Sequence, residues 1–148
     1  MRRLRYTFNF DDTKMITMFR STGYRVTRAQ ISDWLKKEDD AAFKKCSDTQ
    51  MALFLNGFIN SKRGIKEGEQ PTPEKSLNNN IIFRKIRIAL NLKDEDVLEI
   101  IKLAGMKVSK HEVSAFFRTP GHKHYRNCGD QMLRCFLKGL QIKHRAAS

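Results

Sequence analysis

The chain matches itself when it is shifted by 82 residues. Residues 2–63 align with residues 84–145 without a gap, and 13 of the 62 aligned pairs are identical. The identical pairs include Arg5/Arg87, Asn9/Asn91, Asp12/Asp94, Gly23/Gly105, Cys46/Cys128 and Gly57/Gly139. Because a gapless register keeps every helical period in phase, the pattern indicates a duplicated structural unit. A unit of about 60 residues is marginal for a core of its own, so we predict that the two copies pack together with pseudo-twofold symmetry.

Each copy is predicted to contain four helices and no strand. Apolar residues recur at helical spacing, as in Phe83, Ile86 and Leu90, and no segment alternates with period two. Asn78, Asn79 and Asn80 can cap the helix that carries this stripe. The other expected boundaries are capping boxes at Thr27-x-x-Gln30, Ser47-x-x-Gln50 and Ser109-x-x-Glu112, and helix ends at Gly23 and Gly105. The predicted fold is therefore all-α, with two tandem four-helix units.

The domain boundaries follow from the repeat and from composition. We expect a first helical repeat at residues 1–63, a linker at 64–77 and a second helical repeat at 78–148. Pro71 and Pro73 predict an extended, exposed connector. The first copy begins at Met1, which aligns with Phe83, so it lacks counterparts of the three asparagines. Its first helix is expected to fray, or the chain to start further upstream.

Positive charge is built into both copies. The chain has 29 Lys and Arg against 16 Asp and Glu, a net charge of +13. Residues 1–63 carry a net +6 and residues 84–148 a net +8, whereas residues 64–83 carry −1. Such an excess favours polyanionic partners, namely nucleic acid, anionic lipid or an acidic protein surface. Because the charge belongs to the folded units, we expect a structured basic face.

The two copies diverge most in the loop after the third helix. Residues 36–45 read KKEDDAAFKK, whereas residues 118–127 read RTPGHKHYRN. The cations of the second loop can contact phosphates, and Tyr125 can stack on an exposed base. The alternative is a solvated loop in which Tyr125 packs inward, as Phe43 is expected to do at the equivalent position.

The second and third helices of each copy resemble a helix-turn-helix hairpin. A sequence-reading protein of that class would present residues from the start of the second helix of the hairpin to base edges. These residues are Lys110, His111 and Glu112, or Arg28, Ala29 and Gln30 in the first copy. However, the connection after Gly105 is longer than the usual tight turn, and Glu112 and Asp33 would bring carboxylates toward phosphates. We therefore favour nucleic-acid binding without strong sequence specificity, to either RNA or DNA.

A metal site is weakly indicated. His122, His124 and Cys128 lie close together in the sequence, but a tetrahedral site needs a fourth ligand. Cys46 matches Cys128 in a copy that has no nearby histidine, which favours a packing role for both thiols. We predict no metal and no cofactor.

Catalytic signatures are missing from the sequence. Asp94, Glu95 and Asp96 stand at a predicted helix start, where negative charge complements the helix dipole. No phosphate-binding glycine loop, nucleophile elbow or HExxH motif occurs. The three scattered cysteines fit a reducing compartment, and no apolar run approaches the ~18 residues that span a bilayer. We predict a cytoplasmic protein that is not an enzyme and does not partner a membrane.

Three segments resemble a bacterial family. They are FLNGFINSKRG (54–64), LNNNIIFRKIRIALNLKDEDVLEII (77–101) and VSKHEVSAFFRTPGHKHYRNCGDQMLRCFLKGL (108–140). The chain looks like a member of the YehS-like family, a duplicated domain of unknown function. The resemblance implies a cytoplasmic helical protein with two copies of one domain. It implies no reaction, ligand or site, so no functional residue is transferred from it.

The leading hypothesis is a non-catalytic nucleic-acid-binding protein. Its candidate contacts are the basic and aromatic residues near the linker and in the second-copy loop, namely Lys62, Arg63, Arg84, Lys85, Arg87, Arg118, His122, Lys123, His124, Tyr125 and Arg126. An alternative is an adaptor that docks on an acidic protein partner. A third possibility is an enzyme whose site assembles between the copies.

Overall fold

The structure, a computed structural model, describes residues 1–146. It contains eight helices: α1 (Arg2–Phe8), α2 (Asp12–Arg20), α3 (Arg28–Leu35), α4 (Asp48–Arg63), α5 (Asn79–Leu90), α6 (Asp94–Leu103), α7 (Lys110–Phe116) and α8 (Asp130–Ala146). No strand occurs within these described residues. The all-α prediction with four helices in each copy is confirmed. The last two residues of the predicted second repeat, 147–148, lie outside the described part.

The helix boundaries follow from local side-chain chemistry. Thr27, Ser47 and Ser109 each form the expected capping box at the start of α3, α4 and α7. In each box, the hydroxyl accepts from the backbone N–H of the Gln or Glu three residues later. The side chain of that Gln or Glu accepts in turn from the backbone N–H of the Thr or Ser, so two backbone donors at the helix start are satisfied. Asn9 and Asn91 end α1 and α5 in the left-handed conformation, with φ of 54° and 53°. Asn tolerates this conformation better than most side chains do.

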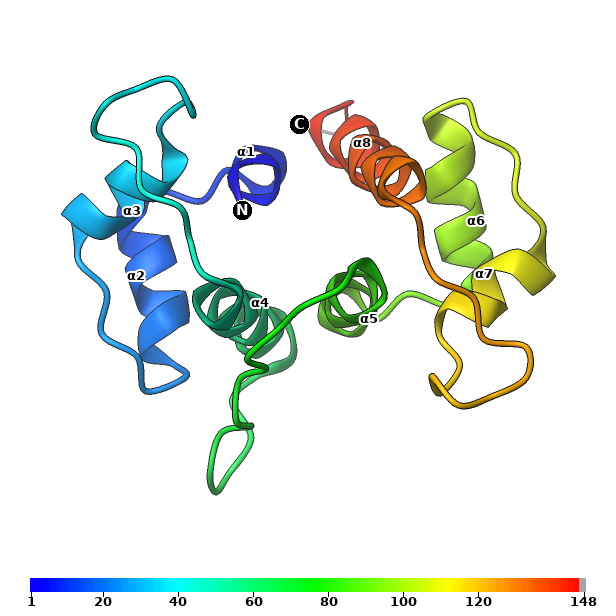
Figure 1. The fold of residues 1–148 in the computed structure, drawn as a ribbon, viewed down its shortest axis with the longest axis horizontal. Coiled ribbons are helices and arrows are strands. Elements are labelled where there is room, and N and C mark those ends of the chain that lie inside the picture. The colour runs from blue at the N-terminus through cyan, green and yellow to red at the C-terminus, as the bar shows by residue number, and fades with distance from the viewer. Residues whose placement is uncertain (147–148) are drawn as a thin grey trace.

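The first helix of each copy packs against the fourth helix of the other copy. Thus α1 packs on α8, and α5 packs on α4. Within each copy the second helix packs on the fourth and contacts the third. Figure 1 shows the result: α1, α4, α5 and α8 stand in the middle, with α2 and α3 at one end and α6 and α7 at the other. This reciprocal exchange gives the pseudo-twofold arrangement that the repeat predicts.

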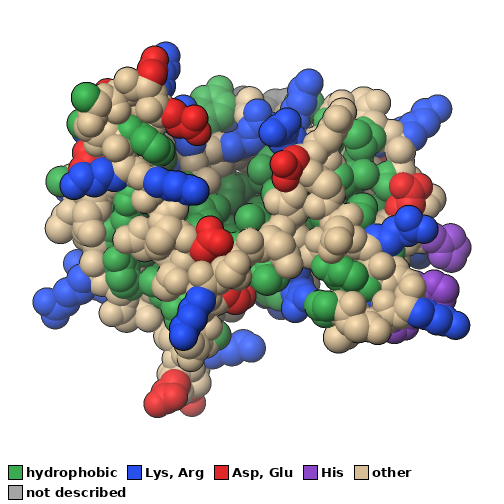
Figure 2. Space-filling view, in the orientation of Figure 1, with side chains coloured by type: hydrophobic (Ala, Val, Ile, Leu, Met, Phe, Trp, Pro, Cys, Tyr) green, Lys and Arg blue, Asp and Glu red, His purple; other side chains and the backbone are tan. Residues whose placement is uncertain are grey.

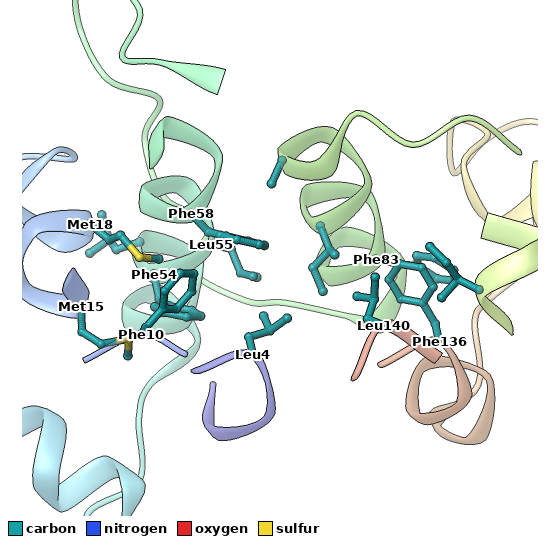
Figure 3. Packing of buried hydrophobic residues seen from close by; sticks show 14 of the residues in the cluster. Leu4, Phe10, Met15, Met18, Phe54, Leu55, Phe58, Phe83, Phe136 and Leu140 are labelled. Carbon is teal, nitrogen blue, oxygen red and sulfur yellow. The ribbon is translucent and has the colours of Figure 1, made fainter. Parts of the chain in front are cut away.

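The apolar residues form one core that both copies share. Fully buried side chains include Phe54 and Phe58 from α4, Phe83 from α5 and Phe136 from α8, and they belong to one connected cluster. Figure 3 shows Leu4 of α1 between the aromatic side chains of α4 and Leu140 of α8. Because each first helix buries its apolar face on the opposite copy, neither copy completes its core alone.

Candidate nucleic-acid interface

Asn80 fastens the basic loop of the second copy to the start of α5. Its side chain is only 3% exposed. The amide nitrogen donates to the carbonyl oxygens of Phe116 (3.1 Å) and Arg126 (2.8 Å), and the amide oxygen accepts from the Cys128 N–H (2.8 Å). Asn78 caps α5 by accepting from the Ile81 N–H at 2.8 Å. The expected cap is therefore confirmed, and the neighbouring asparagine adds a clamp on residues 116–128.

We expect Asn80→Ala to lower the free energy of unfolding by about 3 kcal/mol. The substitution leaves the Phe116 and Arg126 carbonyl oxygens and the Cys128 N–H without the Asn80 side chain as their partner. The Phe116 and Cys128 bonds are buried, and each buried unpaired group costs roughly 1–3 kcal/mol. Urea denaturation followed by circular dichroism measures the change. Asn127→Ala is the matched control, because Asn127 is exposed in the same loop. Equal stability of the two variants would contradict the clamp.

A groove runs between α4 and α5 and is closed by the linker and the second-copy loop. Its volume is about 710 Å³, within the range of about 300–1,000 Å³ that is usual for ligand pockets. Its cations are Arg63, Lys66, Arg84 and Lys85, and Pro120 and Tyr125 reach it from the loop. The remaining lining residues are Asn56, Ile59, Asn60, Gly64, Gln70, Pro71, Glu74, Asn78, Asn80, Ile81 and Ile88.

The end of the linker is hydrogen-bonded to α4, whereas we predicted an extended, exposed connector. Residues 64–69 are exposed, but the Asn60 amide donates to the Gln70 side-chain oxygen at 2.9 Å. The Glu74 carbonyl accepts from the Thr49 hydroxyl at 3.2 Å, and the Leu77 N–H donates to Asp48 at 2.9 Å. These bonds hold the linker as one wall of the groove.

A polar group lies inside the groove. Lys85 donates to the Asn56 side-chain oxygen at 2.6 Å and pairs with the Glu74 carboxylate at 3.1 Å. Asn56 is 6% exposed, and its amide nitrogen, which is itself buried, has no hydrogen-bond partner among residues 1–146. The repeat places Lys138, an exposed residue, at the equivalent position of α8. The buried amide is therefore a feature of this groove alone and not of the repeated unit.

The structure divides the predicted contacts into three groups. Arg63, Arg84, Lys85 and Tyr125 line the groove. The other loop residues on the predicted list are exposed beside it, namely Arg118, His122, Lys123, His124 and Arg126. Lys62 and Arg87 neither line the groove nor belong to the loop. Lys66, which also lines the groove, was missed, because we treated the linker as a connector only.

Arg87 and Lys62 are held by contacts within the fold. The Arg87 guanidinium pairs with Asp94 at 2.9 Å, donates to the Leu92 carbonyl at 2.9 Å and lies 4.3 Å from the centre of the Phe117 ring. The Lys62 ammonium lies 5.1 Å from the centre of the Phe8 ring. The occupied guanidinium of Arg87 has few donors left for a phosphate, and neither Arg87 nor Lys62 lines the groove.

On the face of the molecule that Figure 2 shows, the positive charge is dispersed rather than gathered in one band. Figure 2 shows Lys and Arg side chains spread over the visible face, with carboxylates among them. Within residues 1–146, six basic residues form ion pairs with Asp or Glu: Arg5, Arg28, Lys36, Lys85, Arg87 and Lys110. A continuous basic platform is therefore not seen on this side. The groove and its neighbouring loop are where predicted contacts come together.

The starts of α3 and α7, which a helix-turn-helix protein would present to DNA, carry paired cations. Lys110 contacts the Glu95 carboxylate of α6 at 2.7 Å. Arg28 lies 3.7 Å from the Asp12 carboxylate of α2 and donates to the Thr13 hydroxyl at 3.0 Å. We therefore do not place the interface at these helices.

The cysteines and histidines do not converge. Cys128 is buried, whereas His122 and His124 are exposed. The centres of the two imidazole rings are 5.5 Å apart. Burial raises the pKa of the Cys46 and Cys128 thiols to about 11, which disfavours the thiolate that metals bind. Among residues 1–146, no three His, Cys, Asp or Glu side chains are grouped so that they could hold a metal ion. No helix in this part combines the length and apolar character needed to cross a membrane.

Comparison with known proteins places the chain in a family. Residues 1–64 and 79–146 match the family described as "Protein of unknown function (DUF1456)". The "Uncharacterized protein YehS" of Escherichia coli (strain K12) is 41% identical over 144 residues, which cover 97% of this chain and 92% of that protein. No solved structure matches. The two matched segments correspond to the two halves that exchange their first helices, and the chain belongs to the DUF1456 family.

Proposed function

We propose that this chain is a cytoplasmic, non-catalytic nucleic-acid-binding protein. Its contact surface is the groove between α4 and α5 together with the exposed loop at residues 118–127. The supporting observation is that Arg63 of α4, Arg84 of α5 and Tyr125 of the loop line one hollow although they are distant in sequence. Guanidinium groups bind phosphate oxygens by paired hydrogen bonds, and an aromatic ring offers a face for a base.

The charge around this hollow supports a polyanionic ligand. Lys66 adds a third cation beside the two arginines, and Lys123 and Arg126 are exposed in the adjoining loop. Contacts to the phosphate backbone carry no sequence information by themselves. The expected binding is therefore salt-dependent and not strongly sequence-specific, with RNA and DNA both accepted.

We expect the Arg63→Gln/Arg84→Gln double variant to bind nucleic acid at least about tenfold more weakly at low salt. Each lost phosphate contact should lower the slope of log K against log salt by about 0.7–0.9, so the double variant should lose about 1.4–1.8. Fluorescence anisotropy with a labelled oligonucleotide, repeated across a salt series, measures both quantities.

The matched control is Lys102→Gln/Arg134→Gln. It removes the same net charge from exposed positions of α6 and α8 that do not line the groove. We expect its affinity and its salt slope to stay close to those of the unaltered protein. If both double variants lose affinity equally, the groove has no special part in binding. If the unaltered protein binds no oligonucleotide at low salt, the proposed function is wrong.

A second candidate function is an adaptor that docks on an acidic protein partner. The observation that favours it is the apolar part of the groove, where Ile59, Ile81 and Ile88 lie between the cations. Ile88 is 46% exposed, and apolar surface rimmed by polar residues is typical of protein interfaces. Affinity purification with and without nuclease separates the two candidates, since a protein partner survives the nuclease and co-purified nucleic acid does not.

A further inference from the structure

One cation of the groove is already neutralised by the chain itself. The Lys85 ammonium lies 3.1 Å from the Glu74 carboxylate, and the two side chains are 13% and 32% exposed. The ammonium also donates to the Asn56 side-chain oxygen at 2.6 Å. Among the described residues that line the groove, Glu74 is the one that is acidic. The linker therefore places a single negative charge in a hollow whose other charged side chains are cations.

The repeat shows that this ion pair is not part of the duplicated unit. Lys85 is equivalent to Arg3 of the first copy, whereas Glu74 lies in the linker and has no counterpart. Arg3 is exposed and forms no ion pair among residues 1–146. In contrast, the ion pair between Arg87 and Asp94 has its equivalent in the first copy. The carboxylate on Lys85 is therefore an addition to the groove and not a part of the repeated scaffold.

The linker does not need this carboxylate to stay attached to α4. The backbone carbonyl of Glu74 accepts from the Thr49 hydroxyl, and the other attachments are made by Gln70 and by the Leu77 N–H. A Glu side chain moves between staggered rotamers by rotation about its own bonds. The Glu74 carboxylate can therefore leave Lys85 while the backbone of the linker remains in place.

A phosphate of a nucleic acid can replace the carboxylate without leaving Lys85 unpaired. Both groups carry one negative charge, and both accept charge-assisted hydrogen bonds from an ammonium. An unpaired ammonium is costly where water is largely excluded, so Lys85 favours states in which it holds an anion. Arg63 and Arg84 line the same groove, and a strand that they bind carries further phosphates into it.

We infer that Lys85 is a phosphate-binding residue of the groove and that the linker carboxylate of Glu74 competes with the ligand for it. In the free protein the carboxylate holds the ammonium, and in the complex a phosphate takes its place. The inference rests on the proposed function and adds to it an internal competitor that weakens binding. Since phosphates carry no sequence information, this competition lowers the affinity for all sequences alike.

Glu74→Gln should raise the affinity of the protein for nucleic acid. The substitution keeps the size of the side chain and removes the charge that competes for Lys85. With a labelled single-stranded DNA of mixed sequence, about 15 nucleotides long, we expect at least about threefold tighter binding at low salt. The slope of log K against log salt should steepen by about 0.7, because a phosphate contact is gained without the release of a carboxylate. Fluorescence anisotropy across a salt series measures both quantities.

Glu69→Gln is the matched control. It removes the same charge from the same linker, at an exposed position that does not line the groove. We expect its affinity to stay within about twofold of that of the unaltered protein, because solvent and salt screen an exposed charge. Its salt slope should not change. Circular dichroism checks that both variants keep the helical content of the unaltered protein.

A second substitution tests whether Lys85 makes the gained contact. The double variant Glu74→Gln/Lys85→Gln has the net charge of the unaltered protein and keeps an amide that can donate to the Asn56 oxygen. We expect it to lose the gain in affinity and the added slope of about 0.7. Glu74→Gln/Lys102→Gln has the same net charge, but Lys102 is exposed on α6 outside the groove. That control should keep the steeper slope.

The outcomes separate this inference from the proposed function. If Glu74→Gln binds no more tightly than Glu69→Gln, the inference is overturned while the proposed function stands. A gain that survives the removal of Lys85 overturns the assignment of the phosphate to this residue. If neither the unaltered protein nor any variant binds the DNA at low salt, the proposed function fails and the inference fails with it.

Discussion

Gly139→Ala should destabilise the protein by about 3 kcal/mol, which lowers the melting temperature by on the order of 10 °C. A Cβ at Gly139 would collide with the backbone carbonyl of Ile100, where α8 crosses α6. The clash involves a helix backbone, which cannot rotate away as a side chain can. It therefore outweighs the gain of about 1 kcal/mol that Ala brings to a helix interior.

Gly57, the equivalent of Gly139 in the first copy, should be equally intolerant of Ala. A Cβ at Gly57 would collide with the carbonyl of Met18, where α4 crosses α2, and Met18 and Ile100 are themselves 82 residues apart. Gly121→Ala is the matched control, because nothing lies within 4 Å of a Cβ built there. Thermal denaturation of the three variants measures the difference. A melting temperature of Gly139→Ala equal to that of the control would show that the helices do not cross as closely as described.

The isolated first copy should not fold as a monomer. In a fragment of residues 1–64, α1 loses its partner α8 and α4 loses its partner α5. Side chains that are buried in the whole chain, such as Leu4 and Phe58, would then be exposed on faces that have no cover. We expect the fragment to be largely unfolded at low concentration, or to form a dimer in which each α1 packs on the α4 of the other fragment.

Circular dichroism and analytical ultracentrifugation over a range of concentrations test this prediction. Adding the complementary fragment, residues 65–148, should restore helical content at a one-to-one ratio, because it supplies α5 and α8. The full-length chain under the same conditions is the control. A fragment that stays monomeric, helical and cooperatively folded would contradict the exchange of first helices.

Local structure could be predicted from the sequence because its causes are local. The capping boxes at Thr27, Ser47 and Ser109 need only residues three positions apart, and all three are present. The sequence shows that Arg5 and Arg87 are an identical pair, but not what either side chain contacts. Each arginine pairs with the equally repeated Asp12 or Asp94, at 2.7 Å and 2.9 Å. The identity of Arg5 and Arg87 is therefore explained by a structural ion pair that both copies share.

The partner of each helix could not be predicted in the same way. An apolar stripe such as Phe83, Ile86 and Leu90 shows which face is buried, but it does not show which helix covers that face. The exchange of first helices, and the groove that forms between α4 and α5, depend on contacts between residues far apart in the sequence. Tyr125 and the loop cations were selected from composition. The burial of Asn56 could not be predicted, because an Asn in the middle of a helix carries no signal of burial.

Nucleic acid that occupies the groove between α4 and α5 should be open to covalent capture there. The experiment is photo-cross-linking to a single strand that contains 4-thiothymidine, followed by mass spectrometry of the linked peptides. We expect links to the peptide that contains Tyr125 and to the segment of α5 around Arg84. Links confined to α2 and α3, or to α6 and α7, with none at the groove, would contradict it.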